Sequence, residues 1–249
     1  MTSGFAEEDV GGDARLMVAE AKTTSIRHDQ GRQLSTSLKL AVDEALKKHP
    51  AVIIGEDHSD STVKRDLAAA IPKLQITVTH LGLEALPADA QSLVDDYFNT
   101  RGEDAALADK VAAVLKEHFL FFNCSGYMDI IRAATKAGIA IVALDLPDNE
   151  QTNIHGASPS TLNDDKERFM AKRIIGVLSA SPSAKLLILT GWGHARMDRL
   201  PKKILEESGA VVPGIAALPM KELAELSAAD KNGFSVLVEL TATPSIPKN

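Results

Sequence analysis

Residues 186–197 read LLILTGWGHARM: an apolar run stops at a glycine, and a histidine, His194, follows three residues later. The same arrangement occurs once earlier, in AVIIGEDHSD at residues 51–60, where a glycine ends the run and His58 follows. A glycine at the end of a strand lets the backbone turn sharply, because no Cβ stands in the way. The two stretches therefore predict two buried strands that each present a histidine just beyond the strand's carboxyl end.

Similar apolar runs alternate with helical patterns from residue 35 onward. The expected strands lie at 51–54, 76–86, 139–147, 186–191, 211–217 and 234–240. The expected helices lie at 35–49, 89–97, 104–121, 127–137, 163–178 and 221–226, and a further helix after the fourth strand ends near residue 208. Nearly continuous apolar strands that alternate with helices are typical of a parallel sheet covered on both faces. The sequence thus predicts an α/β fold of three layers, with a mostly parallel central sheet and helices on both faces.

The chain divides into two parts by composition. Residues 1–33 are polar, contain glycine and show no sustained periodicity, so we expect a flexible N-terminal tail. Residues 34–249 are long and apolar enough to bury one large core, and we expect them to form a single α/β domain.

The charge and the cysteine content of the chain indicate which partners and which cellular compartment to expect. The net charge is -7, and the 27 basic residues do not gather into a stripe, which argues against a nucleic acid or an anionic membrane as partner. The single cysteine, Cys124, excludes an internal disulfide and fits a reducing compartment. We expect neither a signal peptide nor a transmembrane segment, because no apolar run is long enough and the N-terminus lacks a basic start.

Ionisable side chains follow four of the expected strands. Glu56 and His58 follow the first strand, Glu84 lies near the end of the second, Asp145 lies near the end of the third, and His194 follows the fourth. Each has an ordinary explanation by itself: an acid can favour a helix N-terminus, an aspartate can form a turn, and a single histidine is usually structural. Because the carboxyl ends of parallel strands meet at one edge, where ligands bind, their convergence favours one functional site.

The two histidines suggest two kinds of chemistry. The partial positive charge of a helix N-terminus disfavours imidazolium, so we expect His58 and His194 to be neutral, with Glu56 or Glu84 orienting a histidine. A neutral histidine can activate water in a hydrolytic site, while the second histidine and a carboxylate stabilise charge on the substrate. Two histidines and a carboxylate also suit a divalent metal, Zn or Mn. The spacing leaves both possibilities open.

Three other features are expected to be structural or are left open. The segment FFNCSGY at 121–127 lacks the G-x-S-x-G elbow of a serine nucleophile, so Cys124 is expected to be a small buried residue. His118 is expected at the surface. Trp192, the single tryptophan, either covers the ligand site or only packs beside it.

Four short motifs together resemble a known superfamily. They are GEDH at 55–58, GLEAL at 82–86, DDKERFMAKRI at 164–174 and GWGH at 191–194. In this order they resemble the erythromycin esterase and ChaN-like superfamily, which is related to the Tiki and TraB proteins with paired G-x-x-H motifs. The resemblance spans residues 52–197, and the order and spacing of the motifs carry most of its specificity.

The resemblance implies roles for individual residues. Those implied to be catalytic are Glu56, His58, Glu84 and His194, and those implied to support them are Asp145 and Arg168. Many relatives carry a second histidine after the first motif, whereas this chain has Arg65 seven residues after His58, and we expect Arg65 to bind substrate or support the site.

The resemblance also implies a function. We expect an esterase-like hydrolase that acts on a small-molecule or host-cell ligand, and that works in the bacterial cytoplasm or, as a virulence effector, inside a host cell. The alternative is an effector that binds a ligand, a metal or haem without turnover. The low aromatic content of 4% weighs mildly against haem. The oligomeric state stays open.

Overall fold

The computed structural model describes residues 25–26, 34–118, 124–148, 150, 159–227, 230 and 233–240. The strands are β1 (Ser25–Ile26), β2 (Ala51–Glu56), β3 (His80–Pro87), β4 (Ala140–Asp145), β5 (Leu186–Gly191), β6 (Gly214–Pro219) and β7 (Val236–Leu240). The helices are α1 (Leu34–Lys48), α2 (Thr62–Ala70), α3 (Gln91–Asn99), α4 (Ala105–His118), α5 (Cys124–Lys136), α7 (Pro159–Ala180), α8 (Leu200–Ser208) and α9 (Met220–Glu225). Among these residues, no helix is both long and apolar enough to cross a membrane.

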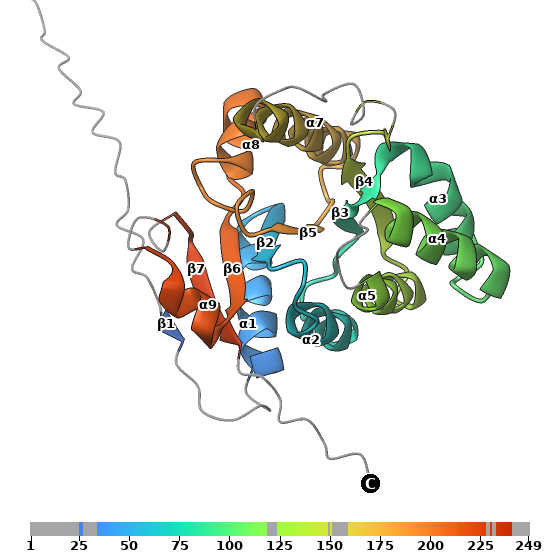
Figure 1. The fold of residues 1–249 in the computed structure, drawn as a ribbon, viewed down its shortest axis with the longest axis horizontal. Helices are drawn as coiled ribbons and strands as arrows, with labels where there is room; N and C mark the ends of the chain where they lie inside the picture. The colour runs from blue at the N-terminus through green and yellow to red at the C-terminus, as the bar shows by residue number, and fades with distance from the viewer. Residues whose placement is uncertain are drawn as a thin grey trace, which may run out of the picture.

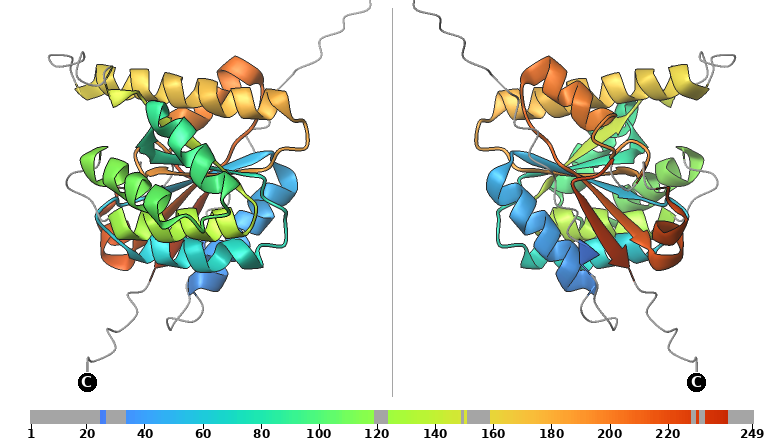
Figure 2. Two further views of the ribbon diagram at one scale, coloured as in Figure 1. Left: turned by 90° about the vertical axis from the view of Figure 1, so that its right-hand side faces the viewer. Right: turned by 90° about the vertical axis from the view of Figure 1, so that its left-hand side faces the viewer.

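The strands form one parallel sheet in the order β1-β7-β6-β2-β5-β3-β4. Helices α1, α2 and α5 cover one face, and α7 and α8 cover the other (Figures 1 and 2). This confirms the predicted α/β class and the three layers. The reason lies in the strands, which are apolar on both sides and can be buried only if helices pack on both.

The two faces divide the residues of each central strand. In β2, Val52 and Ile54 pack in the cluster under α1, α2 and α5, whereas Ala51 and Ile53 pack under α7 and α8. The side chains alternate because successive residues of a strand point to opposite faces.

Two elements differ from the sequence expectation. Helix α2 lies directly after the first G-x-x-H loop, where the sequence predicted a helix N-terminus but gave the helix no bounds. Ser25–Ile26, within the expected tail, pairs in parallel with Leu237 and Val238 at the edge of the sheet. The rest of residues 1–33 lies outside the described residues, as does the loop that contains His155.

Candidate functional site

The candidate site lies at the carboxyl ends of three adjacent strands. In the sheet, β5 lies between β2 and β3, so the segments that carry both histidines and both glutamates are neighbours. Glu56 is in register with Gly191, the last residue of β5. The topology therefore brings together four residues that the sequence separates by up to 138 positions, from Glu56 to His194.

Glu56 is fully buried and has three polar neighbours. Its Oε1 accepts a hydrogen bond from the Tyr127 hydroxyl and lies 3.2 Å from His58 Nδ1. Its Oε2 accepts a hydrogen bond of 2.6 Å from the buried ammonium of Lys64. An unpaired buried carboxylate would be very costly, so Lys64 provides the compensating charge.

Carboxylates and imidazoles then alternate across the site. His58 Nε2 lies 3.9 Å from Glu84 Oε2, and Glu84 Oε1 lies 3.5 Å from His194 Nε2. On the far side of His194, Nδ1 lies 2.9 Å from Glu167 Oε1. Glu167 is buried and also accepts a 2.8 Å hydrogen bond from Arg199. Both histidines thus have acidic neighbours at both ring nitrogens.

This arrangement shifts the pKa of His194. Burial alone would lower the pKa of His194, but the nearby Glu84 and Glu167 carboxylates outweigh burial and raise it above its ordinary value. The surroundings of His194 thus favour the protonated ring over the neutral imidazole that was expected. The reason is that no helix begins directly after β5: α8 starts only at Leu200, while two carboxylates are in immediate contact.

The histidines open onto a cleft of about 550 Å³. Trp192 contributes to its wall, which favours the reading in which the tryptophan borders the ligand site. Acidic residues Asp57, Asp198 and Asp230 and basic residues Arg196 and Arg199 line the remainder. The cleft thus presents charged groups of both signs, which suit a ligand that carries polar groups.

The glycines of the two loops provide space. Neither Gly55 nor Gly191 has a positive φ. A Cβ at Gly55 would lie 2.6 Å from the Trp192 Cα, and a Cβ at Gly191 would lie 2.8 Å from His58 Nε2. Close approach between the two loops therefore requires the glycines, and the sharp turn expected from the sequence is not the reason.

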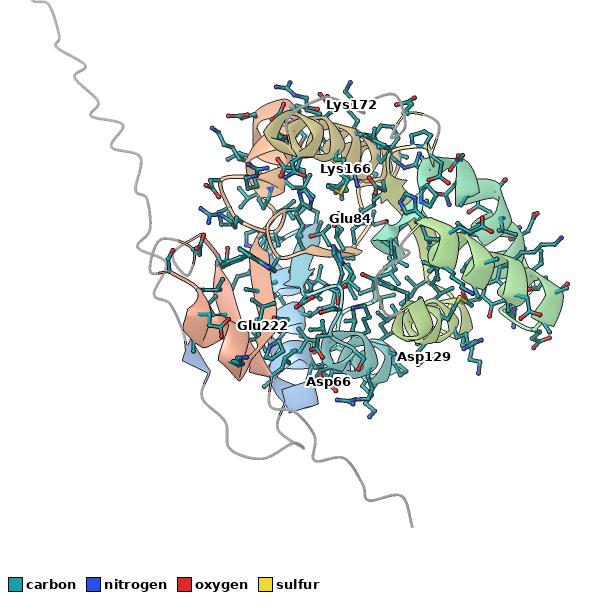
Figure 3. The ribbon with its side chains drawn as sticks, in the orientation of Figure 1. Asp66, Glu84, Asp129, Lys166, Lys172 and Glu222 are labelled. Atoms are coloured by element: carbon teal, nitrogen blue, oxygen red, sulfur yellow. The ribbon has the colours of Figure 1, made fainter. Side chains whose placement is uncertain are left out.

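Asp145 lies in a separate buried cluster. Its Oδ2 contacts His118 Nε2 at 3.1 Å and the Lys166 ammonium at 2.7 Å. Burial would raise the pKa of Asp145, but His118 and Lys166 outweigh burial and lower it. His118 is only 3% exposed and bonds also to Asp148, so its expected surface position is wrong. Figure 3 shows Lys166 on the side of α7 that faces Glu84, whereas Lys172 lies on the outer side.

Arg65 and Arg168 lie outside the cluster. The Arg65 side chain is 53% exposed beside Asp66, and Arg168 is 61% exposed and paired with Asp164. The inward residues are their neighbours, Lys64 and Glu167, because consecutive residues on a helix point about 100° apart.

Sequence reasoning thus missed Lys64, Glu167 and Tyr127. A helical reading of residues 62–70 would have separated Lys64 from Arg65, since Val63, Lys64 and Leu67 share the buried face. No pattern in the sequence singles out Tyr127.

In the part of the chain that the structure describes, no group of three or more His, Cys, Asp or Glu side chains is arranged to hold a metal ion. The donor set explains this, because each carboxylate of the row already contacts a cation, an N–H group or an imidazole. The Zn or Mn site that the sequence left open stays a prediction.

Comparisons with known proteins agree with this architecture. The family model described as "Haem-binding uptake, Tiki superfamily, ChaN" matches residues 42–169. The search of curated proteins finds no match. Among solved structures, the type III effector HopBA1 is similar at 15% identity, with a TM-score of 0.57 and coverage of 81% of this chain and 91% of that one.

Two further structures share the fold. ChaN of Campylobacter jejuni, solved with cofacially bound haem, is 15% identical, with a TM-score of 0.53 and coverage of 80% and 90%. RRSP, a MARTX toxin effector domain from Vibrio vulnificus, is 20% identical, with a TM-score of 0.52, and the match covers 88% of this chain and 42% of that one. At these identities the likeness shows the fold alone.

Proposed function

The chain belongs to the haem-binding uptake, Tiki superfamily, ChaN family, and from this membership and the geometry of the cleft we propose that it is a hydrolase in which His58 activates a water molecule. The observation that carries the proposal is the row of alternating carboxylates and imidazoles that borders a cleft with charged residues in its wall. Such a row can move a proton and stabilise charge at the same place.

His58 is the general base. Its Nδ1 faces Glu56, and its Nε2 lies toward Glu84 and the loop at Gly191. Nε2 takes a proton from water while the water oxygen attacks the carbonyl carbon of an ester or amide. The same proton then passes to the leaving oxygen or nitrogen as its bond to carbon breaks. Glu56 and Glu84 stabilise the imidazolium that forms in between.

His194 is the electrophilic partner. With its pKa raised by Glu84 and Glu167, it holds a proton more readily than an ordinary histidine. A protonated imidazole at the cleft stabilises the negative charge that develops on the carbonyl oxygen. Glu167 keeps this ring in place through Nδ1.

The experiment measures hydrolysis of p-nitrophenyl acetate by the purified protein and its variants. We expect His58→Gln and His194→Gln each to lower kcat/KM by about 100-fold or more, the usual contribution of acid-base groups. His80→Gln is the matched control. His80 lies at the amino end of β3, whereas the site lies at the carboxyl ends of the strands, and its ring contacts Thr79. Equal activity in the wild type and both site variants would refute the proposal.

We further propose that the hydrolase acts as an effector inside another cell. This proposal is supported by two of its structural neighbours, HopBA1 and RRSP, which are effectors. Expression of the wild type in eukaryotic cells should impair growth, and His58→Gln should not. The same growth defect with both would contradict an effector activity that depends on the site.

Haem binding without turnover is the second candidate, favoured by the family description and by haem-bound ChaN. Haem iron is commonly held by His, Tyr, Cys or Met in a largely apolar pocket. Both tyrosines of this chain, Tyr97 and Tyr127, are buried, and the cleft is lined by charged residues. Among the described residues that line the cleft, His58 and His194 could hold the iron, while the charged residues around them disfavour a largely apolar macrocycle.

Titration with haemin separates the two candidates. We expect no stoichiometric Soret band that depends on His58. A one-to-one Soret complex that His58→Gln abolishes, without esterase activity, would replace the hydrolase by the haem-binding candidate. Elemental analysis of the same preparation tests the divalent-metal alternative, since stoichiometric Zn or Mn lost in His58→Gln would restore it.

A further inference from the structure

The Tyr127 hydroxyl lies between the two residues that form the base of the proposed reaction. It donates its hydrogen to Glu56 Oε1, and its oxygen lies 2.9 Å from His58 Nδ1. A phenol has one hydrogen to donate. Because that hydrogen goes to Glu56, the contact with His58 is a hydrogen bond only if Nδ1 carries the proton.

The direction of the Tyr127 hydrogen bond assigns the tautomer of His58. With the hydrogen on Nδ1, the ring donates toward Tyr127 and the more distant Glu56 Oε1 at 3.2 Å. The lone pair then lies on Nε2, the nitrogen on the side of Glu84 and Gly191. A general base requires this tautomer, because a protonated Nε2 cannot accept a proton from water.

Lys64 holds Glu56 and the loop that carries His58. Its fully buried ammonium donates to Glu56 Oε2 at 2.6 Å and to the backbone oxygens of His58 at 2.9 Å and Asp60 at 2.7 Å. It also lies 4.8 Å from the centre of the Tyr127 ring. One side chain therefore connects the end of β2, the loop that carries His58, and α5.

Gly126 explains how Lys64 and Tyr127 can be neighbours. A Cβ at Gly126 would lie 2.8 Å from both Cβ and Cδ of Lys64. Gly126 and Tyr127 thus both serve the site.

We propose that Tyr127 and Lys64 are positioning residues, which fix His58 in the Nδ1-protonated tautomer and hold Glu56 and the His58 loop beside it. This rests on the proposed hydrolase, for which His58 is the base. Neither residue reaches the substrate, so each acts on kcat through His58 and Glu56.

The first test is Tyr127→Phe, with Tyr97→Phe as the matched control. Both tyrosines are fully buried, but the Tyr97 hydroxyl bonds to the Gly102 carbonyl, far from Glu56 in the sequence and outside its contacts. We expect Tyr127→Phe to lower kcat on p-nitrophenyl acetate by about 10- to 100-fold, the range typical for losing an orienting partner, with little change in KM. Tyr97→Phe should keep the wild-type kcat.

The second test is ¹⁵N NMR of the imidazoles, with His58→Gln used to assign the His58 signals. At a pH where His58 is neutral, the wild type should show a protonated Nδ1 and an unprotonated Nε2, and Tyr127→Phe should show a mixture of tautomers. A wild type with its proton on Nε2, or a Tyr127→Phe variant with unchanged tautomer and kcat, would overturn the inference.

The NMR result also separates this inference from the proposed function. If the wild type turned over no ester but showed the Nδ1-protonated tautomer and its loss in Tyr127→Phe, the hydrolase would fail and the positioning role would stand. Lys64→Met adds a check on the second residue: a folded variant, judged by circular dichroism, should lose kcat at least as strongly as Tyr127→Phe. A folded Lys64→Met with the wild-type kcat would remove Lys64 from the pair.

Discussion

His194 has a carboxylate near each ring nitrogen, and this is why its chemistry differs from that of a histidine at a helix N-terminus. In two helices of the site, a shift of one position along the chain decides whether a charged side chain reaches the cluster. Lys64 and Glu167 reach the cluster, while the next residues, Arg65 and Arg168, point outward. At the residue scale, the helical rotation between neighbours decides which charge enters the site.

Glu167→Gln should lower the pKa of His194, because the variant removes a negative charge and a charge-assisted hydrogen bond. An NMR titration of the His194 ring measures this shift directly. Glu206→Gln, which changes an exposed acid on α8 paired with Lys202, is the control and should leave the titration unchanged. An unaltered His194 pKa in Glu167→Gln would contradict the assigned cause.

The raised pKa of His194 also determines how the free energy of unfolding depends on pH. His194 binds its proton more tightly in the folded than in the unfolded state, so its contribution to the free energy of unfolding is fully present below the ordinary value of 6.5. The contribution is lost as the pH rises through the raised pKa. Urea unfolding of wild type and His194→Gln should therefore differ more at acidic than at alkaline pH, and the opposite trend would contradict the assignment.

At the scale of elements, the two G-x-x-H loops pack against each other. Gly55 makes room for the backbone of Trp192, and Gly191 makes room for His58, so each loop depends on the glycine of the other. The repeated motif thus reflects mutual close approach of two strand ends in register.

Gly191→Ala should fold but lose activity, because the added methyl group would lie 2.8 Å from His58 Nε2 and displace the ring. We expect a loss of about 1–3 kcal/mol in the free energy of unfolding, typical of overpacking, and a reduced kcat. Gly176→Ala, in α7, is the control: nothing lies within 4 Å of the new Cβ. It should keep kcat and gain about 0.4–1 kcal/mol. A Gly191→Ala variant with wild-type kcat would show that this contact is unimportant.

At the scale of the whole molecule, helices cover both faces of the sheet, so the core consists of two clusters, one on each face. The site lies at the carboxyl ends of the strands, between these two layers. Glu167 of α7 and Arg199, directly before α8, reach the site from one side, and Lys64 of α2 and Tyr127 of α5 reach it from the other; Figure 1 shows these helices on the two faces. The site is therefore assembled from both outer layers.

Ile53→Ala and Ile54→Ala test the two-sided core. These neighbours are both fully buried but belong to opposite clusters, so each should cost about 2–5 kcal/mol in urea unfolding. Leu205→Ala, at an exposed position on α8, should cost much less. A near-neutral change at either isoleucine would mean that one face of the sheet is not packed.

By itself, the sequence determined the class of fold and the four residues Glu56, His58, Glu84 and His194 at one edge of the sheet. It could do so because apolar periodicity reports burial, and because parallel strands end on the same side. Only the tertiary structure decided the direction in which the pKa of His194 shifts and the partners Lys64, Tyr127 and Glu167. A pKa and a hydrogen-bond partner depend on distances between segments far apart in the chain, and those distances exist only once the layers have packed.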